Sequence, residues 1–162
     1  MSEEFKKKIF KRENESEVKG SVFTTSFKLN EVSQNDAVWS DDYMIQGLPF
    51  CVGVKHFPDK MSLGIFLAVK SVKLKPVKSC KVRFRLKLLN KISNKSVTQE
   101  FEFIFKPGGI GYGYHSFINW YRFKDSLKGF VDKKNKFSVQ TTIKIINTEN
   151  TLTPLQHKLK LK

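Results

Sequence analysis

Residues 81–105 read KVRFRLKLLNKISNKSVTQEFEFIF and contain two segments in which apolar and polar side chains alternate. In the first segment the apolar positions are Val82, Phe84, Leu86 and Leu88, and the basic positions between them are Lys81, Arg83, Arg85 and Lys87. In the second, Phe101, Phe103 and Phe105 alternate with Glu100, Glu102 and Ile104. A period of two is typical of strands that bury one face, so this stretch predicts a β-hairpin.

The two faces of this hairpin also predict a pairing register, with the turn centred between Ser93 and Asn94. The register gives three facing pairs, which are Phe84 with Phe103, Arg85 with Glu102, and Lys87 with Glu100. Aromatic rings then meet on one face and opposite charges on the other. A slip by one residue would turn every side chain to the wrong face, so the pattern argues against it.

The segments on either side of the hairpin are also rich in β-forming residues. Strands are expected at 22–29, 48–57, 62–72 and 136–146, with polar turns at 30–42 and 126–135 and a short helix within 116–123. The continuous apolar run at 62–72 is typical of a strand that is buried on both faces. Seven to eight strands without intervening long helices predict an all-β fold, an antiparallel β-sandwich.

Composition and charge limit the classes to which this chain can belong. Its 162 residues suit one domain, and 30 Lys and Arg against 15 Asp and Glu give a net charge of +15, which favours anionic partners. The N-terminus has no apolar segment of signal-peptide length, and no run is long enough to span a membrane. Cys51 and Cys80 both fall in expected strands and are interpreted as buried thiols of a reducing compartment. A cytoplasmic location, or a nuclear one, is therefore expected.

The chain divides into three parts by composition. Residues 1–19 are expected to be a flexible charged extension, residues 20–147 the folded domain, and residues 148–162 a basic tail. The extension is too short for a coiled coil of three or four heptads, so a monomer is expected.

Nothing in the sequence favours catalysis, a cofactor or a metal site. The glycines of 108–113 lack the Gly-Lys-Ser/Thr ending of a phosphate-binding loop. His56, His115 and His157 are scattered, and neither cysteine has a second ligand at metal-binding spacing. We therefore expect a binding module rather than an enzyme.

The stretch 111–120, GYGYHSFINW, is expected to be an aromatic turn whose rings line a binding pocket. It resembles the W-G-[FY]-x-x-F-I signature of MATH (meprin and TRAF homology) domains, with Tyr112 in place of the usual Trp. The segment 47–52, GLPFCV, resembles the G-[IL]-P-W-x-[IV] strand of that family, and the segments 63–67 and 82–90 resemble its next two strands.

This resemblance implies an antiparallel sandwich of seven or eight strands that binds short extended peptides in an aromatic groove. The basic charge of the chain would favour acidic peptides among them. In the ubiquitin-ligase adaptors of the family, five aromatic side chains line this groove. The positions that match them here are Phe66, Phe84, Phe103, Tyr112 and Tyr114. Relatives that bind Ser-containing motifs often carry an Asp just before the Trp-Gly pair, and Gly111 stands at that position. The resemblance therefore implies protein partners, including components of the ubiquitin pathway, and puts a Ser/Thr-specific motif in doubt.

Phe84 and Phe103 also lie on the face that the alternation assigns to the core, so they have a second interpretation as core residues. A second function remains open as well, because residues 70–95 hold ten basic side chains and no acidic one. Lys81, Arg83, Arg85 and Lys87 should project together from one sheet face. Such a surface would bind nucleic acid or another polyanion, or would be a solvated face that pairs with Glu100 and Glu102.

Overall fold

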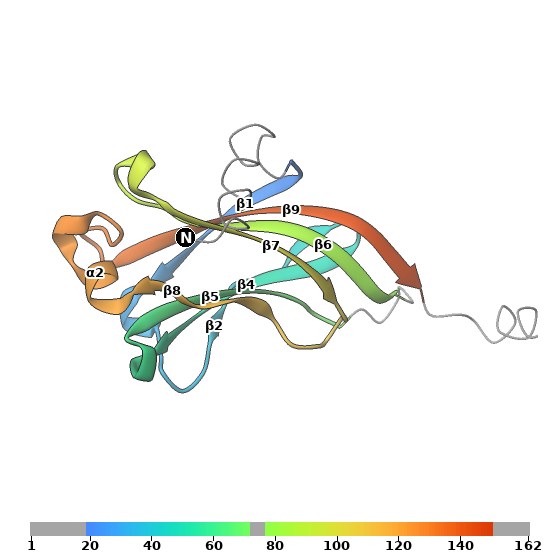
Figure 1. The fold of residues 1–162 in the computed structure, drawn as a ribbon, viewed down its shortest axis with the longest axis horizontal. Coiled ribbons are helices and arrows are strands. Elements are labelled where there is room, and N and C mark those ends of the chain that lie inside the picture. The colour runs from blue at the N-terminus through green and yellow to red at the C-terminus, as the bar shows by residue number, and fades with distance from the viewer. Residues whose placement is uncertain (1–18, 72–76, 151–162) are drawn as a thin grey trace, which may run out of the picture.

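The computed structural model describes residues 19–71 and 77–150, which form two antiparallel sheets packed face to face (Figure 1). The four-stranded sheet has the order β1-β9-β6-β7, with β1 Ser21–Lys28, β9 Lys136–Asn150, β6 Val77–Leu88 and β7 Val97–Phe105. The five-stranded sheet has the order β2-β4-β5-β8, and β3 also pairs with β4. Its strands are β2 Val38–Trp39, β3 Tyr43–Ile45, β4 Leu48–Phe57, β5 Ser62–Val69 and β8 Tyr112–Asn119. The predicted all-β sandwich is confirmed. The short strand β2 lies within the stretch 30–42 expected to be a turn, and β3 follows just after it.

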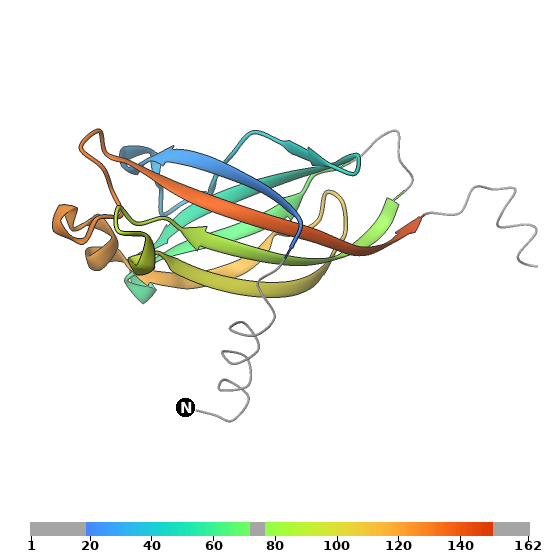
Figure 2. The same ribbon diagram turned by 90° about the horizontal axis from the view of Figure 1, so that it is seen from above.

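Within residues 19–71 and 77–150, one α-helix and four short 3-10 segments connect these strands. The helix α2 spans Trp120–Lys124, and the 3-10 segments are η1 Leu29–Glu31, η2 Pro58–Lys60, η3 Ser93–Lys95 and η4 Ser126–Lys128. Figure 2 shows α2, the β6–β7 loop and η4 gathered at one end of the sandwich. The charged extension predicted at 1–19 lies outside the described residues apart from Lys19. The same holds for the predicted basic tail beyond Asn150, where β9 ends.

The core consists of the inward-facing side chains of both sheets. Phe50, Phe84, Phe105 and Phe123 are fully buried, and Phe137 retains 2% of its exposed surface. In β5 every side chain except that of Phe66 is buried, as expected for a strand between two neighbours. Phenylalanine therefore accounts for much of the core volume, and the one partly exposed position in β5 points away from the core.

The pairing register of the hairpin differs from the prediction by two residues. Phe84 lies opposite Phe101, Arg83 opposite Glu102, and Arg85 opposite Glu100. A shift of two keeps every side chain on its predicted face, so the alternation could not distinguish the two registers. The connection decides between them: Asn90 N donates to Ser96 Oγ at 2.9 Å, and η3 tightens the loop before β7 begins.

The predicted aromatic turn is also corrected, because Tyr112–Asn119 forms strand β8 along the edge of the five-stranded sheet. The helix expected within 116–123 begins only at Trp120. Asn119 ends the strand and caps this helix, since its Oδ1 accepts hydrogen bonds from Tyr121 N at 3.0 Å and Arg122 N at 3.1 Å. Pairing with β5 is a tertiary interaction, and it overrides the turn preference of the two glycines.

Candidate functional site

Strands β7 and β8 are the outermost strands of their sheets on the same side of the sandwich (Figure 1). β7 pairs only with β6, and β8 pairs only with β5, among the strands that the structure describes. Each therefore presents one row of backbone N–H and C=O groups that no described strand covers. Such edges are ready to accept another extended chain.

Aromatic rings bridge these two edge strands. The rings of Phe103 on β7 and Tyr112 on β8 are stacked, with centroids 4.1 Å apart and planes 7° from parallel. Phe101 meets the same tyrosine edge-on at 5.9 Å. Tyr112 and Tyr114 point to the same side of β8 and keep 39% and 41% of their surface exposed. We call Phe101, Phe103, Tyr112 and Tyr114 the aromatic edge.

Gly113 fixes the position of the two tyrosines. A Cβ atom on Gly113 would lie 2.1 Å from the carbonyl oxygen of Ile65 and 2.7 Å from Cα of Phe66, which are backbone atoms of β5. Only glycine allows β8 to approach β5 this closely. The register between the strands shifts just beyond, between Leu63 and Ile65, where Ser62 Oγ donates to the carbonyl of His115 at 2.7 Å.

The structure does not bring the five matched aromatic residues together. Phe84 is fully buried and stacks on Phe101 at 5.1 Å, so it supports the aromatic edge from within the core instead of lining a groove. This corrects the expectation drawn from the resemblance and agrees with the alternation of β6. Phe66 projects from the outer face of the five-stranded sheet, where its ring lies 6.0 Å from that of Phe57. Phe103 and Tyr112 do lie in contact, and Tyr114 follows Tyr112 on the same side of β8.

Trp39, within the stretch expected to be a polar turn, covers part of the outer face of the five-stranded sheet. A Cβ on Gly53 would lie 2.7 Å from its indole ring, and one on Gly111 would lie 3.1 Å from its Cη2. The indole therefore borders the place where relatives often carry a carboxylate, and it remains 42% exposed. The sequence feature that marks this position of Trp39 is Gly53, the small residue opposite it in β4. That feature can be recognised only once the register Trp39↔Gly53 is known.

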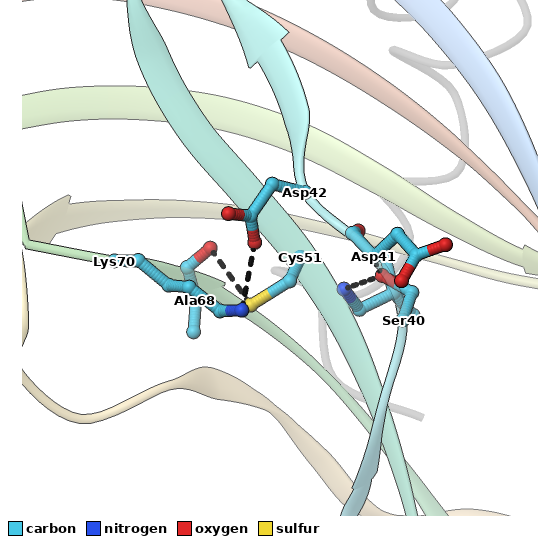
Figure 3. Close-up of polar contacts among 7 residues, drawn as sticks. Ser40, Asp41, Asp42, Cys51, Ala68 and Lys70 are labelled. Atoms are coloured by element: carbon cyan, nitrogen blue, oxygen red, sulfur yellow. Dashed lines mark hydrogen bonds and ion pairs between the residues drawn. The ribbon is translucent and has the colours of Figure 1, made fainter.

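An ion pair and the buried thiol of Cys51 lie in the same region of the five-stranded sheet (Figure 3). Lys70 Nζ lies 2.8 Å from Asp42 Oδ1, and the thiol donates to the carbonyl of Ala68 at 3.9 Å. Burial raises the pKa of Cys51, an effect that the neighbouring Lys70 partly opposes. Ser40 Oγ accepts from Val52 N at 2.9 Å, which fastens the start of this loop to β4. The ion pair and the Ser40 contact hold the loop, and burial keeps the thiol protonated.

The four predicted cations do share the outer face of the four-stranded sheet. Glu102 Oε2 lies 3.7 Å from Lys81 and its Oε1 lies 3.2 Å from Arg83, so one carboxylate serves two bases. Arg85 donates to Thr142 Oγ1 at 3.3 Å, and Lys87 lies opposite Gln140 of β9. We call Lys81, Arg83, Arg85 and Lys87 the basic face.

The histidines within the described ranges are engaged in ring contacts. His56 stacks on Trp120 at 3.8 Å, and its pKa is lowered by burial and by the charge of Lys124. His115 lies 6.0 Å from the ring of Phe57. In residues 19–71 and 77–150, no group of three or more His, Cys, Asp or Glu side chains could hold a metal ion. Within the same ranges, no helix has the length and hydropathy that crossing a membrane requires.

Comparisons with known proteins agree with this architecture. The family model for the MATH domain matches residues 21–143. Among solved structures, Notothenia coriiceps TRAF5 superposes with a TM-score of 0.54 at 11% sequence identity, covering 82% of this chain and 77% of that one. A search of curated proteins found no match. At this identity the structural likeness shows the fold, and the family model shows the membership. The chain belongs to the MATH domain family.

Proposed function

We propose that this MATH domain binds short extended peptides of partner proteins at the aromatic edge. The peptide adds to the free edge of β8 as a further strand, and its side chains pack beside Tyr112 and Tyr114. Main-chain hydrogen bonds would supply affinity, while the rings would supply selectivity. MATH domains are protein-interaction modules, and we extend that role here to a site and a type of ligand.

The observation that carries the proposal is the stacked pair Phe103–Tyr112 beside two strand edges that no described strand covers. Tyrosine is well suited to such contacts, because a rigid ring offers a large contact area at low entropic cost and its hydroxyl group stays hydrated or hydrogen-bonded. Micromolar affinity, ~8 kcal/mol, is what we expect of so small a contact.

Alternation along a bound strand would give its side chains two different environments. One set would meet the aromatic edge, and the other would meet the outer face around Phe66 and Trp39. Gly111 offers no carboxylate to a ligand hydroxyl, and the ring of Trp39 borders that place. We therefore expect apolar or aromatic ligand positions in place of serine, with flanking acidic residues favoured by the net charge of +15.

A peptide selection tests the proposal. Random peptides displayed on phage would be selected on the wild-type domain, and the affinities of the selected peptides measured by fluorescence anisotropy. Tyr112→Ala/Tyr114→Ala should weaken binding by about 2 kcal/mol or more, roughly thirtyfold. Tyr121→Ala is the matched control, since Tyr121 is 64% exposed on α2. If both variants bind alike while circular dichroism shows them folded, the aromatic edge is not the site.

The proposal also includes the pathway in which the domain acts and its location in the cell. As in adaptors of the ubiquitin pathway, the bound protein would be presented to a ligase or a deubiquitinase, in the cytoplasm or the nucleus. No catalytic role is assigned to the domain itself. Co-purification with tagged ubiquitin-pathway proteins, compared between wild type and the double tyrosine variant, would test this part separately.

A second candidate function is polyanion binding at the basic face, favoured by one specific pairing. Arg83 on β6 lies directly opposite Lys144 on β9, and both are exposed. Like charges placed directly opposite each other destabilise a sheet. A phosphate backbone would relieve this repulsion.

Duplex DNA of mixed sequence is the probe for this second function. Lys87→Glu/Lys144→Glu should weaken binding and flatten its salt dependence by about two units of log–log slope. Lys60→Glu/Lys106→Glu makes the same change in net charge at exposed sites outside the basic face. Equal losses of DNA affinity in both variants would mean that binding depends on net charge and not on the basic face.

A further inference from the structure

A pocket of about 770 Å³ lies where the β6–β7 loop meets the segment after α2. It is separate from the aromatic edge, and none of the four residues of the basic face lines it. Its volume is typical of sites for small molecules. The two walls come from residues 90–97 and 126–130, and Arg122 of α2 contributes as well.

Among the residues that the structure describes, four cationic side chains and no carboxylate line this pocket. The cations are Lys91, Lys95, Arg122 and Lys128. Asp125, the acidic residue nearest in sequence to the second wall, uses its Oδ1 to accept the backbone N–H of Leu127 at 3.0 Å. A ligand with several negative charges would complement these four cations.

Hydrogen bonds between the two loops hold the walls in place. Asn90 is 9% exposed, and its Nδ2 donates to the carbonyl of Lys128 at 2.7 Å while its Oδ1 accepts from Ile92 N at 2.9 Å. The backbone N–H of Lys91 donates to the carbonyl of Gly129 at 2.8 Å. Gly129 adopts φ +88°, and a Cβ there would lie 2.7 Å from Asn90 Oδ1. The cations therefore extend from a backbone frame that is already formed before any ligand arrives.

Two large apolar side chains at the pocket are exposed to solvent. Leu127 keeps 91% of its surface exposed and Ile92 keeps 51%, one on each wall. Exposed apolar groups beside a cationic pocket suit a phosphorylated headgroup whose acyl chains remain in a membrane, since cations hold the phosphates while apolar side chains enter the lipid.

We propose that this pocket binds a compact ligand that carries several phosphate groups, either a free inositol polyphosphate or the headgroup of a phosphoinositide. Lys95 and Lys128 contact the phosphates from opposite walls, and Asn90 positions the walls. The site is independent of peptide binding at the aromatic edge.

Two probes distinguish the sources. Inositol hexakisphosphate would be titrated by calorimetry, and phosphatidylcholine vesicles with or without a phosphatidylinositol bisphosphate would be tested by flotation. We expect each domain to bind one probe molecule saturably. The affinity should fall at least about tenfold in Lys95→Gln/Lys128→Gln. Lys60→Gln/Lys106→Gln removes the same charge from exposed residues outside the pocket and should keep wild-type affinity.

The outcomes decide both the site and the ligand source. Loss in the pocket variant alone supports the proposal. Equal loss in both variants, or no saturable binding of either probe to the wild type, overturns it. Where the proposal is supported, flotation assigns the source. Flotation of the wild type that falls in Ile92→Ser/Leu127→Ser, with unchanged binding of the soluble probe, indicates the lipid headgroup, and binding of the soluble probe without flotation of the wild type indicates the free ligand. Circular dichroism and urea denaturation would establish that each variant is folded.

Discussion

The rings of Phe103 and Tyr112 stack with centroids 4.1 Å apart, although the two residues belong to different sheets. The pair joins the sheets at the side of the sandwich where both have a free edge. It therefore contributes to folding as well as to the proposed peptide site, and these two contributions can be separated.

Replacing these rings singly and together should reveal their coupling. Aromatic pairs contribute about 0.5–1.5 kcal/mol beyond their buried area. A double-mutant cycle of Phe103→Ala and Tyr112→Ala, measured by urea denaturation, should give an interaction free energy in this range. Strict additivity would mean that the stacking does not persist in solution.

Lys144→Glu should stabilise the domain. The change places a carboxylate opposite Arg83 in the β6–β9 ladder and replaces a repulsive pair by an attractive one, worth about 0.2–1 kcal/mol. The free energy of unfolding should rise at low salt, and the gain should shrink at high salt, since the pair is exposed. Lys60→Glu serves as the control, because Lys60 is exposed and lies in η2, outside the strand ladders. A loss of stability in Lys144→Glu would contradict the register.

Gly113→Ala should destabilise the fold by about 1–3 kcal/mol, because its Cβ would collide with backbone atoms of β5. Gly111→Ala is the matched comparison. Its Cβ would lie 3.1 Å from Leu67 O and from the Trp39 ring, and the ring can shift. We expect a smaller loss there in thermal denaturation; equal losses would argue against the close β5–β8 approach.

Phe84→Ala should lower the free energy of unfolding by about 3–5 kcal/mol, since the side chain is fully buried and its removal leaves a cavity. Phe66→Ala should cost roughly 1–2 kcal/mol, because its ring is partly exposed on the outer face. Guanidinium denaturation of both variants tests the assignment of Phe84 to the core. If the Phe84→Ala domain is stable but binds peptide poorly, Phe84 belongs to the ligand site and not to the core.

Cys80 should make stability fall at alkaline pH. Burial raises the pKa of its thiol from 9.0 to about 11. Between these values the unfolded chain loses the proton while the folded chain keeps it, so the stabilisation is complete below pH 9 and is lost as pH rises toward about 11. The loss amounts to about 2–3 kcal/mol. Urea denaturation at several pH values should show a flatter profile for Cys80→Ala than for wild type, and parallel profiles would refute the assignment.

Much of the fold follows from local patterns in the sequence. The alternation of β6 and β7 predicted which side chains are buried, and the apolar run of β5 predicted a central strand. The faces of Lys81, Arg83, Arg85 and Lys87 were predicted correctly for the same reason, because side-chain period is a property of a single strand. The register of the hairpin was wrong by two residues, since a shift of two preserves every face.

The candidate sites depended on contacts between segments far apart in the sequence. Phe103 and Tyr112 were singled out, but their stacking arises because β7 and β8 end their sheets on the same side. Trp39 was missed, because its place over Gly53 depends on the pairing of β2 with β4. The cationic pocket depends on Asn90 joining two loops.

The sequence by itself determined the fold class, the buried faces and the strongly basic character, all of which follow from local periodicity and composition. Only the tertiary structure decided the strand register, the strand conformation of Tyr112–Asn119 and the grouping of residues into sites. These depend on hydrogen bonds and packing between distant segments, whose free energies no local pattern of side chains specifies.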